Sequence, residues 1–314
     1  MYFNKLALDK IFEKCKSDEN SNYNCLVPLS GGKDSTYILY LCVKKFKLKP
    51  LALTFDNGFF SETGRQNTIN AVEILGVDHL IVKPSWNEMK NAYRIMIATY
   101  GFSCIFCDHS IFHISRYIQK KFNIPLIILG GSPRTQGKPS KLLYRIDYWA
   151  IISAYKKADL ENHYFDNFAW FKENLKNENP LGLLDVDRIS LPYYLEWPED
   201  EIPQILAKEL KWQKSDNSTE HVDCYLAKIK DYIAYKIWGF PWQEIKYSDL
   251  IRDGQLTREN ALLLLNKDLT MLNEEPSYFD EYLKKLDYTK FEFCRILEKI
   301  NKYPFKKIDC ENHL

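Results

Sequence analysis

The stretch VPLSGGKDSTYILY, Val27 to Tyr40, joins a predicted strand to a predicted helix. The apolar residues before Ser30 indicate a buried strand. After Ser35, apolar residues return at the spacing of one helix face, at Ile38, Leu41, Cys42 and Phe46. Pro28 cannot donate a ladder hydrogen bond, so we expect a bulge or an unpaired position near the strand end. The two adjacent glycines therefore lie at a strand-to-helix turn.

Strands and helices alternate from Cys25 to Gly131, which is typical of a parallel sheet covered on both faces. We expect further strands over residues 50–56, 79–83 and 124–129. We expect helices over residues 61–75, 85–100 and 108–122, the second of them opened by a Ser85–Glu88 capping box. Later, residues 188–195 predict a returning strand, and a helix follows with Pro198 near its first turn.

From Lys228 onward the pattern is helical. The predicted fold class is therefore α/β, a parallel-sheet domain with a helical C-terminal extension. The expected organisation is an N-terminal helix within residues 1–22, the α/β domain over 23–212, and the helical region over 213–314. Residues 132–187 show no clear apolar period, so we predict that they form an irregular insertion in the α/β domain.

The composition is that of a globular protein, with 46% apolar and 27% charged residues among 314. Lys and Arg number 43 and Asp and Glu 42, so the net charge of +1 gives no overall attraction to a polyanion. Nucleic acid is therefore a weaker candidate partner. The lysines at 44, 45, 47 and 49 are better explained as a solvated helix end than as a binding patch.

No segment contains the roughly 18 uninterrupted apolar residues of a membrane span. The first residues, MYFNKLALDKIFEKC, carry acidic residues and lack a small-residue cleavage site, so we interpret them as a helix and not as a signal peptide. We expect a cytoplasmic protein. Its 8 cysteines should then be reduced thiols, metal ligands or catalytic groups, and not structural disulfides.

The loop residues are suited to holding phosphate. Gly31 and Gly32 allow the backbone to approach phosphate oxygens, and successive N–H groups form an anion-binding concavity. The helix that follows presents the positive end of its dipole. Hydroxyl donors come from Ser30, Ser35 and Thr36.

Two charged residues follow the glycines. Lys33 supplies a positive point charge. Asp34 would be repelled by bare phosphate, so it either binds Mg²⁺ or caps the helix. The nucleoside-triphosphate P-loop is excluded, because that motif needs four residues between its glycines.

The order SGGKDS, Ser30 to Ser35, resembles the PP-loop of the ATP pyrophosphatase superfamily, also called adenine nucleotide alpha-hydrolase-like proteins. The resemblance implies a PP-loop α/β fold. It implies that the loop grips the β and γ phosphates of ATP while the α-phosphate is attacked, releasing AMP and pyrophosphate. It also implies that the backbone at Leu53 and Thr54 reads the adenine ring.

Further nucleotide contacts are expected at the carboxyl ends of the strands, where open α/β sheets bind ligands. Asp56 follows the second strand, and a plain turn explains TFDNG equally well. Gly130 and Gly131 end a later strand, where related proteins let the backbone approach the nucleotide. A tight turn is the alternative for these glycines.

A pair of cysteines, Cys104 and Cys107, lies at the predicted start of a helix, a position that lowers thiol pKa values. With Cys224, the pair resembles the cysteines of PP-loop tRNA thiolases, which implies that all three hold a [4Fe-4S] cluster whose open iron carries hydrosulfide. The alternatives are a zinc site completed by His221 or His109, a redox pair that passes persulfide sulfur, and unrelated buried thiols. We interpret the other five cysteines as structural.

The C-terminal runs YLAKIKDYIAYKIWGF (225–240) and IRDGQLTRENAL (251–262), preceded by SLPYYLEW (190–197), are similar to N-acetyl sugar amidotransferases. Those PP-loop proteins of nucleotide-sugar and surface-polysaccharide pathways insert nitrogen drawn from a partner glutaminase. Arg252 and Arg258 could bind a substrate anion or belong to a charged helical surface.

We therefore predict an enzyme that adenylates a carbonyl or carboxyl oxygen with Mg²⁺ and ATP and then replaces that oxygen with sulfur. Asp34 and the three cysteines Cys104, Cys107 and Cys224 are the predicted catalytic residues. The expected substrate is small or carrier-bound, the sulfur comes from a separate donor, and no membrane partner is expected. The alternatives are nitrogen insertion with a glutaminase and a non-catalytic ATP-binding protein. The sequence is compatible with a homodimer.

Overall fold

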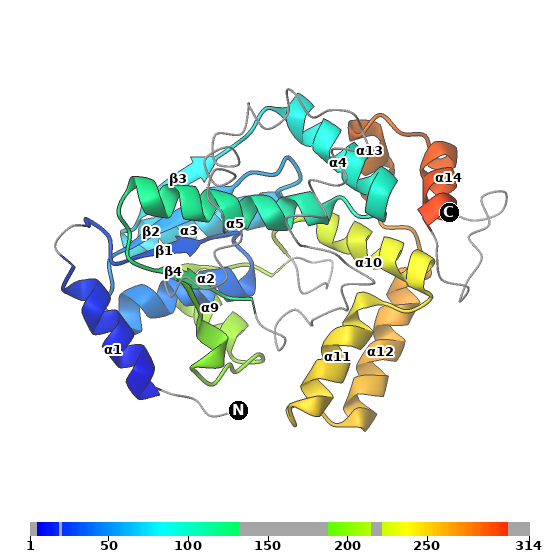
Figure 1. Ribbon diagram of the computed structural model, residues 1–314. Helices are drawn as coiled ribbons and strands as arrows, with labels where there is room; N and C mark the ends of the chain where they lie inside the picture. Colours follow the sequence, from blue (N-terminus) through cyan, green and yellow to red (C-terminus); the bar gives the residue numbers. More distant parts are fainter. Residues whose placement is uncertain (1–4, 19–20, 132–187, 215–221, 301–314) are drawn as a thin grey trace. The chain divides into compact units, whose positions relative to one another are not determined.

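The computed structural model describes residues 5–18, 21–131, 188–214 and 222–300 (Figure 1). The predicted insertion, residues 132–187, therefore lies outside the described residues. The described chain forms two compact units. The first unit contains the described residues up to 84 together with 110–131, 188–214 and 222–224, and the second contains 85–109 and 225–300.

The first unit is built on a five-stranded parallel sheet with strand order β3-β2-β1-β4-β5. The strands are β1 (Cys25–Pro28), β2 (Pro50–Phe55), β3 (Asp78–Val82), β4 (Ile127–Leu129) and β5 (Arg188–Ser190). This sheet, with helices over it, confirms the predicted α/β class. Pro28 is the last residue of β1, opposite Leu53, which agrees with the expectation of a position near the strand end.

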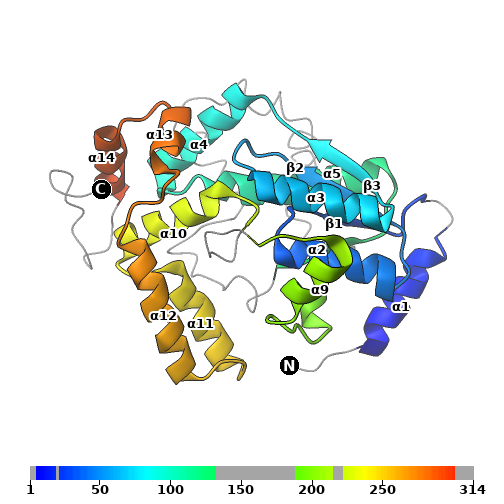
Figure 2. The same ribbon diagram turned by 180° about the vertical axis from the view of Figure 1, so that it is seen from behind.

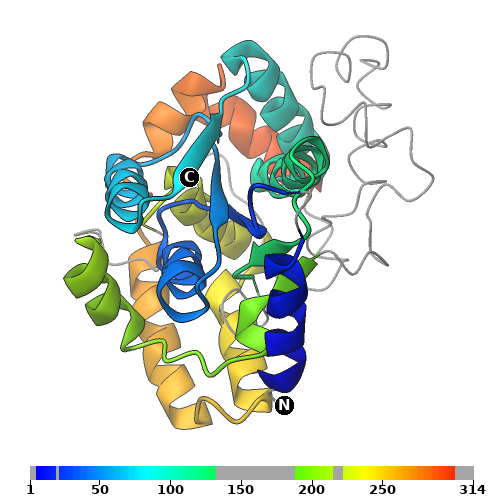
Figure 3. The same ribbon diagram turned by 90° about the vertical axis from the view of Figure 1, so that its left-hand side faces the viewer.

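Alternation along β1 separates two apolar layers. Cys25 and Val27 face a core that includes residues of four helices: α1 (Lys5–Lys16), α2 (Lys33–Tyr40), α3 (Glu62–Leu75) and α9 (Ile202–Leu210). Leu26 faces the other way, toward Ile114 and Ile118 of α5 (Cys104–Lys121). In Figure 3 the sheet lies between α5 on one side and α2 and α3 on the other. After α2 the chain continues as a π-helix over Leu41–Lys45.

The described part of the second unit is helical, as the pattern after Lys228 predicts. Its helices are α4 (Trp86–Tyr100), α10 (Tyr225–Trp238), α11 (Trp242–Arg252), α12 (Arg258–Leu272), α13 (Phe279–Lys285) and α14 (Lys290–Ile300). Figure 2 shows α11 and α12 lying side by side as a hairpin. An aromatic cluster joins α10, α13 and α14, with Phe279 in edge contact with Tyr232 and Phe293 at centroid distances of 5.5 and 5.7 Å. Burial in this cluster raises the pKa of Tyr232 to about 12.

Some predicted boundaries are wrong. The returning strand stops at Ser190, because Pro192 lies in a 3-10 turn over Leu191–Tyr193. The helix expected near Pro198 begins only at Ile202, since the Pro198 carbonyl accepts the Ile202 N–H in a preceding turn. The strand expected over 124–129 covers only β4.

Two predictions about side chains are also wrong. Ser85 is the N-cap residue of α4, but its side chain makes no capping hydrogen bond, so the predicted capping box is incomplete. Cys294, buried in α14, is disulfide-bonded, although we expected no structural disulfide. The prediction about disulfides failed because composition and the expected compartment do not show which cysteines come together in space.

Candidate functional site

The first strand-to-helix turn is tightly packed at Gly31. Its φ is +76°, and a Cβ at this position would lie 2.1 Å from the carbonyl oxygen of Gly64 in α3. The Gly31 carbonyl accepts hydrogen bonds from Trp212 Nε1 at 2.9 Å and from Asn67 Nδ2 at 3.2 Å. Only glycine fits this position, in both conformation and volume.

The hydroxyl groups of the turn bond to one another and to its backbone. The Ser30 N–H donates to Ser35 Oγ at 3.2 Å, and the two serine Oγ atoms lie 3.1 Å apart. The Thr36 hydroxyl is fully buried and has no hydrogen-bond partner among the described residues. Gly32 is the N-cap of α2, so no side chain caps this helix from that position. The first turn of α2 therefore retains the features of an anion-binding helix terminus.

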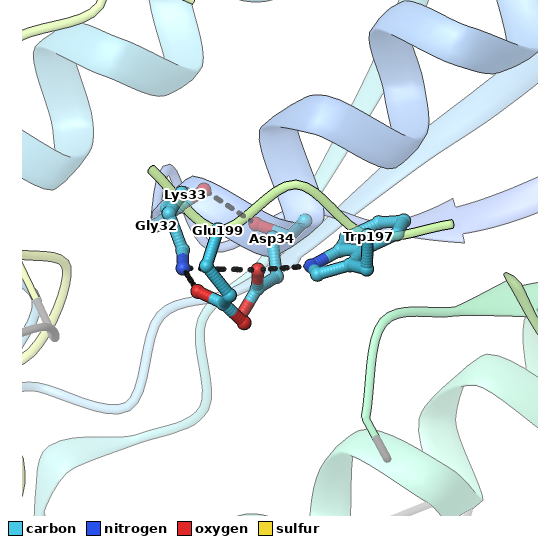
Figure 4. A network of polar contacts seen from close by, with 6 residues as sticks. Gly32, Lys33, Asp34, Trp197 and Glu199 are labelled. Atoms are coloured by element: carbon cyan, nitrogen blue, oxygen red, sulfur yellow. Dashed lines mark hydrogen bonds and ion pairs between the residues drawn. The ribbon is translucent and has the colours of Figure 1, made fainter. Parts of the chain in front are cut away.

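Both charged residues of the turn contact a segment far along the chain (Figure 4). Lys33 Nζ forms an ion pair with Glu199 and lies 3.7 Å from Asp34 Oδ1. Asp34 Oδ1 accepts a hydrogen bond from Trp197 Nε1 at 3.1 Å. The carboxylate of Asp34 therefore bonds to Trp197 instead of capping α2. The ammonium group of Lys33, which sequence reasoning assigned to phosphate, is paired with a carboxylate.

Asp56 is buried at the carboxyl end of β2, where it joins two other elements. Its Oδ2 lies 2.9 Å from Arg65 Nη2 and 3.4 Å from Lys83 Nζ, and its Oδ1 accepts the Gly58 N–H at 3.1 Å. Burial alone would raise the pKa of Asp56, but Arg65, the Gly58 amide and Lys83 outweigh it and hold this pKa below its ordinary value. These contacts favour the turn interpretation of TFDNG. A nucleotide contact at Asp56 stays a prediction.

The hydrogen bonds of the β2 backbone bear on the prediction that Leu53 and Thr54 contact the adenine ring. The Leu53 carbonyl accepts the Leu29 N–H at 2.8 Å, while the Asp56 N–H donates to Val82 in β3. Peptide groups alternate sides along a strand, so those of Leu53 and Phe55 point toward β1 and that of Thr54 toward β3. Phe55 lies beyond the last residue of β1 that pairs with β2. The contacts predicted for Leu53 and Thr54 remain predictions, and Phe55 is a third candidate that sequence reasoning missed.

A short hydrogen-bonded chain supports this end of β1. Thr54 Oγ1 donates to the Leu29 carbonyl at 2.6 Å, and His79 Nε2 lies 2.8 Å from the same hydroxyl. Because the single hydroxyl proton goes to Leu29, His79 Nε2 must be the donor in the second bond. Burial lowers the pKa of His79, so the neutral Nε2–H tautomer is favoured.

The two glycines after β4 have structural roles. A Cβ on Gly130 would lie 2.9 Å from Ile38 Cδ1 and 3.4 Å from Asp34 Cβ, so glycine lets α2 pack against this strand end. The Gly131 carbonyl accepts the Ser190 hydroxyl at 2.5 Å. The nucleotide contact predicted for this pair stays a prediction.

Cys104 and Cys107 lie in the first turn of α5, as expected, and belong to the second unit. Cys104 is partly exposed and Cys107 is buried. Cys224 belongs to the first unit, where Phe60 pairs with it in an isolated β-bridge and Asn57 Nδ2 donates to its Sγ at 3.4 Å. Within the described part of the chain, no three His, Cys, Asp or Glu side chains form a group that could hold a metal ion. The cluster ligands therefore remain a prediction.

Of the two histidines considered for a zinc site, His109 is buried in α5 and His221 lies outside the described residues. Arg252 ends α11, is 68% exposed and pairs with Asp249 three residues earlier. Arg258 begins α12, which Thr257 caps through the Asn260 N–H. These contacts favour the charged-surface interpretation of the two arginines.

Sequence reasoning missed the residues that are far from the loop in the sequence but pack around it in the structure. Glu199, Trp197, Trp212 and Asn67 contact it directly, and a Cβ on Gly32 would lie 3.2 Å from the Asp223 carboxylate. Trp197 follows Asp34 by 163 residues. The acidic run WPEDE after the returning strand was the available signal, although nothing in it specified a contact with Lys33.

Comparison with known proteins gives one family match, at the C-terminal end. Residues 211–312 match the family described as LPS biosynthesis protein WbpG-like, C-terminal domain. The chain is also 24% identical over 263 residues to the uncharacterized protein MJ1599 of Methanocaldococcus jannaschii. That alignment covers 84% of this chain and 79% of the relative.

The solved structures similar to the chain include three at low identity. The U34-tRNA thiolase NcsA from Methanococcus maripaludis with its [4Fe-4S] cluster is 16% identical, with a TM-score of 0.41, and the match covers 88% of this chain and 84% of that one. An NH3-dependent NAD synthetase from Campylobacter jejuni is 17% identical, with a TM-score of 0.34 and coverage of 60% and 93%. NMN synthetase from Francisella tularensis is 14% identical, with a TM-score of 0.32 and coverage of 68% and 97%.

Among the described helices, none combines the length and apolar character needed to cross a membrane. The protein thus carries the sequence SGGKDS, which resembles a PP-loop, at the first strand-to-helix junction of a parallel α/β sheet, followed by a C-terminal region that matches the WbpG-like C-terminal domain.

Proposed function

We propose that this chain is an ATP-dependent enzyme that adenylates a carbonyl or carboxyl oxygen of its substrate and then replaces that oxygen with nitrogen. The proposal rests on the PP-loop itself. SGGKDS lies between a buried central strand and the uncapped N-terminus of α2, with Gly31 in the left-handed conformation. Such a turn directs backbone N–H groups at an anion.

In the proposed reaction, the substrate oxygen attacks the α-phosphorus of ATP and pyrophosphate leaves. Ammonia then attacks the activated carbon, and AMP leaves with the original oxygen. The loop amides and the hydroxyls of Ser30 and Ser35 would hold the pyrophosphate portion, and Lys33 would balance its charge. Asp34 offers a carboxylate oxygen besides the one bonded to Trp197, and carboxylate oxygens are the ligands that Mg²⁺ prefers.

The choice of nitrogen rests on the C-terminal half. The WbpG-like match over residues 211–312 agrees with the similarity of this region to N-acetyl sugar amidotransferases. It supports an N-acetylated nucleotide sugar or a related surface-polysaccharide precursor as the substrate class, with a glutaminase partner as the ammonia source. The sequence alone led us to rank sulfur insertion first and nitrogen insertion second, and the family match reverses that ranking.

Sulfur insertion is the second candidate, because Cys224 accepts a hydrogen bond from Asn57 and Cys104 is partly exposed in the first turn of α5. A hydrogen bond to sulfur stabilises the reactive thiolate. The described residues form no metal-binding group of three, so we derive no step through a cluster or a zinc ion.

The test is to supply Mg²⁺, ATP and a panel of N-acetylated nucleotide sugars, with either ammonium or sulfide, and to measure AMP, pyrophosphate and the modified sugar. We expect AMP and pyrophosphate in equal amounts and, with ammonium, a product in which nitrogen replaces the activated oxygen: an amidine from an N-acetyl group or an amide from a carboxylate. A Cys104→Ala/Cys107→Ala variant should keep this activity, and a Lys33→Ala variant should lose most of it. Release of ADP and orthophosphate would contradict adenylation. A thiolated product that is lost in the cysteine variant would establish the second candidate.

A further inference from the structure

One ammonium group at the loop contacts two carboxylates. Lys33 Nζ forms an ion pair with Glu199 and lies 3.7 Å from Asp34 Oδ1 (Figure 4). The three side chains are only partly exposed, 14% for Lys33, 27% for Asp34 and 30% for Glu199. Two carboxylates in such a place repel each other unless a cation is near both. The Lys33 ammonium group supplies that cation.

Both carboxylates keep an oxygen for a further ligand. Glu199 Oε2 pairs with Lys33, while Glu199 Oε1 is buried and accepts no hydrogen bond from the described residues. A buried carboxylate oxygen without a partner is unfavourable, which favours its binding to a cation. Asp34 is held through its other oxygen, because Oδ1 accepts a hydrogen bond from Trp197 Nε1 at 3.1 Å. Trp197 is itself buried, in edge contact with Tyr37 at a centroid distance of 5.1 Å.

We propose that Asp34 and Glu199 together bind the Mg²⁺ that accompanies ATP, and that Lys33 takes the place of this ion until phosphate binds. The inference rests on the proposed function. Phosphate attracts the Lys33 ammonium group away from the two carboxylates, which then bind Mg²⁺ in its place. Protein sites for Mg²⁺ at phosphates commonly use one or two carboxylates together with phosphate oxygens. A pair of carboxylates is therefore sufficient here, although no three such side chains of the described chain form a metal-binding group.

This exchange couples the binding of the two ligands. Without Mg²⁺, pyrophosphate must separate Lys33 from Glu199 and leave the carboxylates without a cation. Without phosphate, Mg²⁺ must displace the ammonium group and stay close to its positive charge. Each ligand therefore strengthens the binding of the other, and thermodynamic linkage makes the two factors equal.

The first test uses Mn²⁺, a paramagnetic substitute for Mg²⁺, and follows the loss of the free-ion EPR signal with no nucleotide or pyrophosphate present. Lys33→Met removes the charge and keeps a long side chain, so we expect it to bind Mn²⁺ at least about tenfold more tightly than the unaltered chain. Adding Glu199→Gln to this variant should abolish the gain. Adding Glu196→Gln, at an exposed position of the same segment, should preserve it. A Lys33→Met variant without the gain, or a gain that survives Glu199→Gln, overturns the proposal.

The second test is calorimetric titration of pyrophosphate with and without Mg²⁺. We expect Mg²⁺ to strengthen binding by at least about tenfold in the unaltered chain and in Glu196→Gln, and by less than about threefold in Glu199→Gln. The factor falls in Glu199→Gln because metal-free binding improves and the metal ion loses a ligand. Equal factors in the unaltered chain and Glu199→Gln overturn this inference and leave adenylation standing. An unaltered chain that binds no pyrophosphate even with Mg²⁺ overturns the proposed function together with this inference.

Discussion

Comparing two glycines in left-handed conformations distinguishes the cost of backbone strain from the cost of a steric clash. Gly31 in the SGGKDS loop has a φ of +76°, and Gly76 at the end of α3 has a φ of +64°. A Cβ on Gly31 would collide with the Gly64 carbonyl, whereas a Cβ on Gly76 would meet nothing within 4 Å. The two positions therefore share the conformational requirement and differ in available space.

We predict that Gly76→Ala lowers the free energy of unfolding by about 1 kcal/mol, the typical cost of a left-handed alanine. Gly31→Ala should cost several times more, because the loop must move away from α3, and it should also abolish pyrophosphate binding. Urea unfolding and calorimetric titration would measure these effects. Equal losses of stability in the two variants would show that packing at Gly31 is unimportant.

The ion pair between Lys33 and Glu199 leads to a second prediction about single residues. The Glu199 carboxylate is held by the ammonium group that a phosphate would need, so an incoming anion must compete with it. We expect Glu199→Gln to strengthen binding of metal-free pyrophosphate by several-fold, corresponding to roughly 1 kcal/mol.

Glu196→Gln removes an exposed carboxylate from the same segment and is the matched control for this measurement. It should leave the titration unchanged. Weaker binding in Glu199→Gln would contradict the competition and would instead indicate that Glu199 assists the ligand.

Among the elements, β2 and α3 are joined through Asp56, and this contact depends on pH. The pKa of Asp56 in the folded chain lies below its ordinary value, so its contribution to stability is present above about pH 4, the ordinary carboxyl pKa. It is lost as the pH falls through the lowered value. We predict that Asp56→Asn destabilises the chain at pH 7 and flattens the decline in unfolding free energy below about pH 4.

Urea unfolding between pH 3 and pH 7 would check this prediction. Asp9→Asn, at an exposed position of α1, should leave the curve unchanged. If Asp56→Asn retained the full acid-induced decline, the Arg65 and Lys83 contacts would not be the cause of that decline.

Local sequence predicted the existence and type of most elements, because the apolar period of 2 or 3.6 depends only on which face is buried. It predicted their ends less well. Pro192 and Pro198 set the boundaries of β5 and α9 through turns whose hydrogen bonds form only in the folded chain. The Ser85–Glu88 pattern has the spacing of a capping box, yet Ser85 makes no capping bond in the structure.

For the whole molecule, net charge limits the partners. Lys44 and Lys45 end the π-helix that follows α2, and Lys47 and Lys49 lie just beyond it. All four are exposed, as expected for a solvated helix end. With a net charge of +1, we predict that tRNA binds no more tightly than the roughly 10⁻⁴ to 10⁻⁶ M of nonspecific association at physiological salt.

Fluorescence anisotropy with labelled tRNA between 50 and 200 mM salt would measure this affinity. A Lys44→Ala/Lys45→Ala variant should behave like the unaltered chain. Submicromolar binding that this variant loses would contradict the prediction and would favour a tRNA substrate over a sugar precursor.

The amino-acid sequence by itself determined the alternation of strands and helices, the glycine turn and its suitability for phosphate. These follow from short-range properties: apolar period, the freedom of glycine at positive φ, and the identity of six consecutive residues. Only the tertiary structure decided that Trp212 and Asn67 hold the Gly31 carbonyl, that Glu199 pairs with Lys33, and that Gly130 makes room for α2. Those contacts join residues up to 181 positions apart. Their geometry depends on how the parallel strands are ordered, and no local pattern encodes that order.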